Sequence, residues 1–199
     1  DAGPAFEDNA SASPGGRLLS LDLDENELSP YQCLVRKQIE LFEQPPQDSV
    51  GDQTTQGRNR PVRPGQVGIR CRHCGSGRPW LRSRGAILFP STLLGVYQTA
   101  QNMANTHLVK TCRIIPDATR QELLRIRSKE KGKKTRKSSY GGGRQYWADT
   151  LRVLGVIETP DQRLAFASSA SATESSKSEA DVKDETSESP HDGESGQAQ

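Results

Sequence analysis

The stretch that decides the fold is Cys71-Arg72-His73-Cys74-Gly75, followed 32 residues later by His107 and, after four intervening residues, by Cys112. Each pair has the spacing that brings two side chains to one tetrahedral ion, and three thiolates with one imidazole are donors that zinc prefers. Because four protein donors leave no open position for water or substrate, the sequence predicts a structural Zn2+ rather than a catalytic one. The predicted ligands are Cys71, Cys74, His107 and Cys112.

Two alternatives compete with this interpretation. His73 is a second imidazole donor, but its neighbours place it in an outward-facing turn, whereas His107 shares the apolar face of a predicted helix. Cys71 and Cys74 could instead form a redox pair, although such a pair normally opens a helix after a buried strand. The glycines at 75 and 77 do not favour a helix there. Cys33 is expected to be a small buried apolar side chain.

The charges are segregated along the chain, although the net charge of the 199 residues is only +2. Residues 1–57 carry 3 basic and 11 acidic side chains, residues 58–163 carry 22 and 6, and residues 164–199 carry 2 and 8. The net charges of the three parts are therefore −8, +16 and −6. A strongly basic segment between acidic flanks favours a polyanionic partner, the alternative being a solvated basic surface balanced by the flanks.

Composition limits the size of the folded part. Only 32% of the residues are hydrophobic and 5% are aromatic. The apolar residues cluster between about 29 and 166, so residues 1–28 and 168–199 are predicted to be disordered acidic segments. No stretch approaches the ~18–20 apolar residues of a membrane span, and no export signal is visible. We therefore expect no membrane association, and reduced thiols in the nucleus or otherwise the cytoplasm.

The segments around the cysteines are predicted to form two strands and two helices. The first helix begins at Pro30, with Ser29 as its N-cap, and is expected to run through Phe42 and end before Pro45. Residues 66–70 and 86–89 have the pattern of short strands. A helix capped by Ser91 follows and runs to about Val109, so that strand, cysteine turn, strand and helix form a ββα arrangement with a long central insertion.

The C-terminal part is predicted to hold a helix and a hairpin. A helix after Pro116 runs to about residue 126, and residues 127–143 read as a basic linker. Residues 144–154 form a further helix closed by Gly155, and residues 156–166 form a hairpin, similar to the end of a winged helix. The predicted fold class is α+β, with a small zinc-stabilised ββα-type core and additional helices. Residues 29–126 are predicted to form a helix plus the zinc-binding domain, and residues 144–167 a helix–hairpin element that packs on this core.

The predicted function is nucleic-acid binding without catalysis. No phosphate-binding loop, no H-E-x-x-H motif and no zinc deaminase motif is present, and we expect no small-molecule substrate. DNA is favoured over RNA because the larger aromatic residues, Trp80 among them, were expected to lie in the core. A protein-interaction module without nucleic-acid binding is the alternative. The residues expected to contact phosphates are Arg82, Arg84, Lys133, Lys134, Arg136 and Lys137.

Several motifs resemble those of a known group of sequences. They include Val67-Gly68-Ile69-Arg70-Cys71, Tyr97-Gln98-Thr99-Ala100-Gln101-Asn102 and Gly143-Arg144-Gln145-Tyr146-Trp147. Together they resemble an expanded family of hypothetical, zinc-finger-like proteins from unicellular algae, over about residues 28–166. That resemblance implies a shared fold and a shared Cys/His site, and no particular activity. The part from Val67 to Cys112 is more loosely similar to BED-type zinc fingers, which bind DNA, although its 32-residue gap is longer than theirs.

Overall fold

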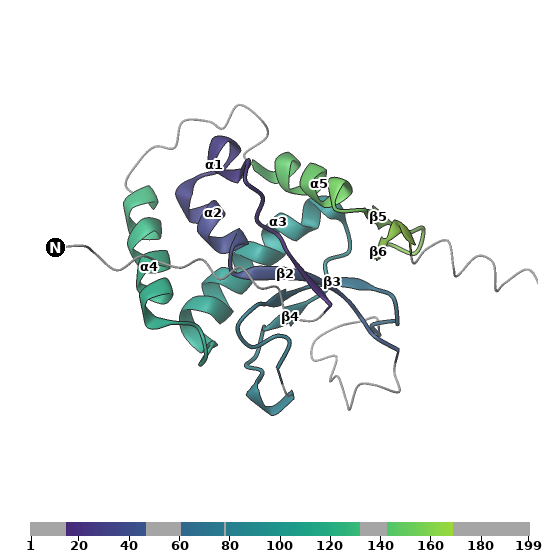
Figure 1. Ribbon diagram of the computed structural model, residues 1–199, viewed down its shortest axis with the longest axis horizontal. Coiled ribbons are helices and arrows are strands. Elements are labelled where there is room, and N and C mark those ends of the chain that lie inside the picture. Colours follow the sequence, from purple (N-terminus) through teal and green to yellow (C-terminus); the bar gives the residue numbers. More distant parts are fainter. Residues whose placement is uncertain (1–14, 47–60, 78, 132–142, 169–199) are drawn as a thin grey trace, which may run out of the picture.

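The computed structural model describes residues 15–46, 61–77, 79–131 and 143–168, drawn in colour in Figure 1. Helices and antiparallel strands are mixed along these residues, which confirms the predicted α+β class. The elements are β1 (Gly16–Leu18), α1 (Asp24–Glu27), α2 (Pro30–Arg36), β2 (Ile39–Glu43), β3 (Val67–Cys71), η2 (Pro79–Leu81), β4 (Ile87–Leu88), α3 (Leu93–Asn102), η3 (Met103–Thr111), α4 (Asp117–Lys131), α5 (Arg144–Val153), β5 (Val156–Glu158) and β6 (Leu164–Phe166).

The centre of the fold is a four-stranded antiparallel sheet in the order β1-β2-β3-β4. Strands β3 and β4 and the helix that follows them have the predicted ββα order, and β1 and β2 enlarge the sheet on one side. Helices α1, α2 and α5 lie above this sheet in Figure 1. The core is apolar and includes the fully buried side chains of Val35, Ile39, Ile69, Trp147 and Leu151.

The predicted helix over residues 30–44 is correct only in its first half. Ser29 caps α2 as expected, its hydroxyl accepting a hydrogen bond from the Gln32 N–H, but the helix ends at Arg36 and residues 39–43 form strand β2. Glu40 of this strand lies opposite Arg70 of β3, and their side chains form a buried ion pair with Nε and Oε2 3.0 Å apart. Pairing on both edges therefore overrides the apolar spacing that favoured a helix.

The prediction that residues 1–28 are disordered is wrong from residue 16 onward, and residues 1–14 lie outside the described part. Strand β1 pairs with β2, and Leu19 is fully buried. Asp24 is buried as well, and its carboxylate accepts hydrogen bonds from Arg36 Nε at 2.8 Å and Tyr146 Oη at 3.0 Å. These bonds connect the acidic segment to α2 and α5. Burial raises the pKa of Tyr146 to about 12, and the Asp24 carboxylate adds to this effect.

The later elements follow the prediction with small differences. The helix after β4 is capped by Thr92 rather than Ser91, since the Thr92 hydroxyl accepts from the Gly95 N–H. Helix α4 extends to Lys131, so the first five residues of the predicted basic linker are helical. Helix α5 and the antiparallel pair β5–β6 confirm the predicted helix and hairpin, and Gly155 has the positive φ of 81° expected after a helix end. The predicted acidic tail lies outside the described residues after position 168.

The buried pair between Asp24 and Arg36 gives a test of the fold. Both side chains are almost fully buried, so Asp24→Ala leaves an unpaired guanidinium in the core. We expect the free energy of unfolding, measured by urea titration, to fall by about 3–5 kcal/mol. Glu25→Ala is the control, because Glu25 is exposed and 3.7 Å from an exposed Lys37 amine, and it should cost less than about 1 kcal/mol. Equal losses in the free energy of unfolding for Asp24→Ala and Glu25→Ala would contradict the buried ion pair between Asp24 and Arg36.

Candidate metal centre

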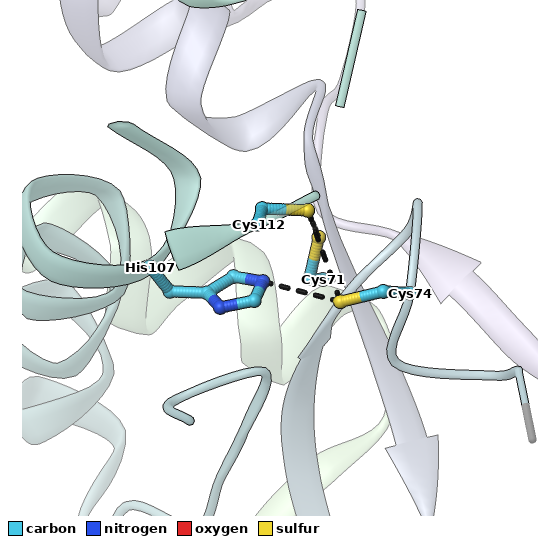
Figure 2. A group of neighbouring side chains, drawn as sticks. All are labelled: Cys71, Cys74, His107 and Cys112. Atoms are coloured by element: carbon cyan, nitrogen blue, oxygen red, sulfur yellow. Dashed lines mark hydrogen bonds between the residues drawn. The ribbon is translucent and has the colours of Figure 1, made fainter. Parts of the chain in front are cut away.

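Four possible metal ligands converge from three parts of the chain. Cys71 is the last residue of β3, Cys74 lies in the turn after it, His107 is on η3, and Cys112 directly follows η3. All four side chains are buried, and their donor atoms lie within 4.8 Å of one another. Figure 2 shows the three sulfurs and one imidazole nitrogen pointing toward a common centre. Among the described residues, the four predicted ligands thus form one cluster that could hold a metal ion.

The distances within the cluster fit a tetrahedral ion. The sulfur of Cys112 is 3.9 Å from that of Cys71 and 3.8 Å from that of Cys74. Metal–sulfur bonds of ~2.3 Å at the tetrahedral angle separate two sulfurs by ~3.8 Å. His107 Nε2 is 3.2 Å from the Cys74 sulfur, somewhat below the ~3.6 Å that a sulfur and a nitrogen ligand would show. The polypeptide therefore holds the donors close to the positions that a tetrahedral metal requires.

The turn after β3 is built for close approach of the backbone. The Gly75 N–H donates to the Cys71 carbonyl at 2.7 Å, which folds the chain back so that Cys74 faces Cys71. A Cβ on Gly75 would lie 2.6 Å from that carbonyl oxygen and 2.7 Å from the Arg70 Cβ. Only glycine fits this position without a shift of the backbone. The predicted turn is thus confirmed, with a steric reason for the glycine that follows the second cysteine.

A π-helical segment supplies the other two ligands. The sequence predicts one α-helix to about Val109, but residues 103–111 form the π-helix η3. The Cys112 N–H donates to the His107 carbonyl at 2.8 Å, a bond between residues five apart. π-Helical turns are rare and are frequent at functional sites. Here the wider turn allows His107 and Cys112, five residues apart, to reach the same side of the helix.

The orientation of His107 is fixed by a backbone carbonyl. His107 Nδ1 lies 3.1 Å from the Arg84 oxygen. A carbonyl can only accept a hydrogen bond, so Nδ1 carries a proton and Nε2 is the nitrogen directed at Cys74. Metal-binding histidines commonly donate their other ring N–H in this way, which fixes the tautomer. This contact could not be predicted from the sequence, because Arg84 contributes through its main chain.

The contacts within the cluster favour thiolates. A hydrogen bond from Cys71 lowers the pKa of Cys74 to about 4 against the effect of burial, and His107 contributes to the lowering. A hydrogen bond from Cys71 also lowers the pKa of Cys112 to about 6. The pKa of Cys71 itself is raised by these two hydrogen bonds and by burial. These shifts favour the thiolate forms of Cys74 and Cys112, and the thiolate is the form that binds metal.

The competing interpretations of the cysteines receive no support. His73 lies outside the cluster, and its Nε2 is 2.9 Å from Gln38 Oε1. A turn rather than a helix follows Cys71, and all four cysteines are free thiols. Cys33 is buried on α2, as expected, and its sulfur is 3.4 Å from the Asp24 carbonyl.

The predicted phosphate contacts fall into two groups. Arg84 is exposed, whereas Arg82 is half-buried and its Nε donates to the Gly77 carbonyl at 3.1 Å. Burial lowers the pKa of Arg82, and the charge of Arg70 adds to this effect. Four further residues lie outside the described part of the chain and stay a prediction, namely Lys133, Lys134, Arg136 and Lys137.

The basic residues beside the ligands also differ in their roles. Arg70 pairs with Glu40, and Arg72 donates to the Lys37 carbonyl at 3.0 Å, so both hold the sheet and the turn together. Lys110 and Arg113 are exposed. Within the described ranges, neither of these two forms an ion pair. They are therefore available to a partner in solution.

Comparison of the chain with protein-family models, curated proteins and solved structures returned no match. The resemblance to algal proteins and to BED-type fingers consequently stays a prediction. Along the described ranges, no helix combines the length and the apolar character that crossing a bilayer would need.

Removal of one ligand tests the cluster directly. We expect purified protein to contain about one divalent metal ion per chain, and Cys74→Ser to lower metal affinity by more than the ~10–100-fold typical of losing an outer contact. The control is Cys33→Ser, which changes a buried thiol outside the cluster and should leave the metal content unchanged. Metal content is measured by elemental analysis after dialysis against a weak chelator. Full metal retention in Cys74→Ser would exclude Cys74 as a ligand.

Proposed function

We propose that the protein is a zinc-stabilised regulatory protein that binds nucleic acid and has no enzymatic activity. We expect it to act in the nucleus, with DNA as its partner. The observation that carries the zinc assignment is the closed set of three sulfurs and one imidazole nitrogen within 4.8 Å of one another. Zinc takes four such donors in structural sites, whereas hard ions such as Mg2+ and Ca2+ prefer oxygen. With four protein ligands the ion has no position left for a substrate, which supports a structural role.

The ion would stabilise the fold by joining the sheet to the helices. Cys71 and Cys74 belong to β3 and its turn, and His107 and Cys112 belong to η3 and its end. A chain with only 32% hydrophobic residues has a limited core, so a bond across these elements contributes much of the stability. The ion would then keep the segment between the two ligand pairs in place.

The charge around this site supports a polyanionic partner. Residues 71–116 include six arginines and lysines and not a single aspartate or glutamate. In the part of the chain that the structure covers, Arg84, Lys110 and Arg113 are exposed and have no carboxylate partner. Arg84 is joined to the site by its carbonyl, and the other two flank Cys112 in sequence. Basic side chains that have no carboxylate partner and lie beside the Cys/His site are able to bind phosphate groups.

A second candidate is a protein-interaction module without nucleic-acid binding. It is favoured by three exposed apolar side chains, Leu94, Val153 and Ile157, on the mutually packed elements α3, α5 and β5. Val153 has the largest exposed fraction of the three, at 81%. Binding to a protein that tolerates high salt would support this candidate, because apolar contacts are screened little by ions.

The salt dependence of DNA binding tests the proposal. We expect a labelled duplex to bind with an affinity that falls steeply with salt, with a log–log slope of about −0.9 for each phosphate neutralised. The triple variant Arg84→Gln, Lys110→Gln and Arg113→Gln should weaken binding and make the slope shallower by about 3. Fluorescence anisotropy at several salt concentrations gives both quantities. Absence of binding to both duplex and single-stranded nucleic acid, even at low salt, would refute the proposal.

A second triple variant controls for the change in net charge. Arg63, Arg125 and Arg152 are also exposed arginines, but each is paired with a carboxylate, of Asp161, Glu122 and Asp149 respectively. Replacing these three by glutamine removes the same charge from other parts of the surface. We expect a smaller change of slope than in the first variant, and an equal change would show that binding is not local to the metal centre.

A further inference from the structure

An exposed tryptophan stands in the segment between the two ligand pairs. Trp80 was expected to lie in the core, but 73% of its surface is exposed, and its neighbour Leu81 is 47% exposed. The other tryptophan, Trp147, is fully buried. Trp80 lies on η2, the short blue turn that projects below the sheet in Figure 1, away from helices α1 and α5. An aromatic side chain in such a position often marks a binding surface.

Both ends of this segment are fixed to the metal centre. Cys74 lies before the turn, and its sulfur accepts a hydrogen bond from the Ser83 N–H. After the turn, the Arg84 carbonyl accepts from His107 Nδ1 at 3.1 Å and from the Thr111 hydroxyl at 3.2 Å. The base of the segment is thereby held by two of the four ligands. A side chain presented on such a base loses little conformational freedom on binding.

The surroundings of Trp80 favour an anionic partner with an aromatic component. Arg82 and Arg84 follow it in sequence, and the nearest acidic residues along the chain are Asp52 and Asp117. The half-buried Arg82 donates to the Gly77 carbonyl, which leaves the exposed Arg84 as the phosphate contact. An apolar protein partner would gain nothing from these cations. A nucleic-acid strand would contact both Trp80 and Arg84, because its bases stack on aromatic rings and its phosphates pair with arginine.

We propose that Trp80 is a stacking platform for an unpaired nucleobase, so that Trp80 and the residues from Leu81 to Ala86 bind single-stranded nucleic acid. The proposal rests on the proposed function and narrows its ligand class. In a duplex the faces of the bases are already stacked on one another, and an exposed indole finds no partner there. Arg84 would contact the adjacent phosphate. The affinity for single strands should then depend on Trp80, whereas the affinity for duplex should not.

The experiment compares strands in parallel. Labelled oligo(dT), oligo(U) and a DNA duplex of the same length are titrated at one salt concentration with the wild type and three variants. Trp80→Ala should weaken single-strand binding by about 5- to 150-fold, the range for loss of one stacked base, and change duplex binding less than twofold. Trp80→Phe should restore part of the affinity. Leu81→Ala is the matched control on the same turn, and it should change neither affinity more than about twofold.

The intrinsic fluorescence of Trp80 supplies an independent readout. A stacked base should quench the exposed indole when oligo(dT) or oligo(U) is added, and Trp80→Ala should lack this quenching because Trp147 is buried. Quenching by one oligonucleotide alone would support the proposal and identify which of the two strands is preferred. Unchanged metal content in each variant shows that the centre is intact.

The possible failures can be told apart. Duplex binding with the expected salt slope, but without quenching by single strands, would overturn the stacking platform and leave the proposed function standing. Equal losses for Trp80→Ala and Leu81→Ala would overturn it as well, since the turn would then act as an apolar contact. A wild type that binds none of the three nucleic acids would refute both proposals.

Discussion

The requirement that four donor atoms lie close enough together to hold one metal ion constrains most of this structure. Cys71 and Cys74 can meet this requirement only if β3 ends in a tight turn, and His107 with Cys112 only if the helix opposite widens. The sheet and the helical layer are thus placed relative to each other by the distances within the cluster, of which two are 3.8 and 3.9 Å. Features that look unrelated, such as the glycine at position 75 and the π-helix, follow from the same geometry.

A second group of buried polar contacts, around Asp24, connects the N-terminal segment to the rest of the fold. Asp24 joins Arg36 and Tyr146, and so links the N-terminal segment with α2 and α5. Glu40 and Arg70 form a further buried pair within the sheet. A chain with few apolar residues therefore combines its core and its Cys/His cluster with buried charged groups that are paired. Each pair specifies which elements meet, because an unpaired charge in the interior is costly.

The sequence allowed the site to be predicted better than the fold around it. Cysteine and histidine spacing is a local pattern with a strict geometric meaning, and the caps at Ser29 and Gly155 are local as well. Residues 39–43 were misassigned because their apolar spacing suits a helix, although the alternation of Ile39-Glu40-Leu41 also suits a strand. Only the partners β1 and β3 decide between the two. The acidic composition before residue 29 likewise concealed the buried carboxylate of Asp24, the one buried acidic side chain among residues 15–28.

The π-helix and the position of Trp80 could not be read from the sequence for a different reason. Both depend on the path that the chain takes between the ligand pairs, and a gap of 32 residues leaves that path open. An aromatic residue in an apolar-poor chain is ordinarily expected in the core. The structure instead places Trp147 in the core and Trp80 on the surface, and Trp80 belongs to the segment between the two parts of the Cys/His cluster.

The most direct test of the central claim is X-ray absorption at the zinc edge on the purified protein. The account predicts one zinc per chain, with three sulfur neighbours at ~2.3 Å and one nitrogen neighbour at ~2.0–2.1 Å. A first shell made only of nitrogen and oxygen, or a zinc content far below one per chain, would contradict it.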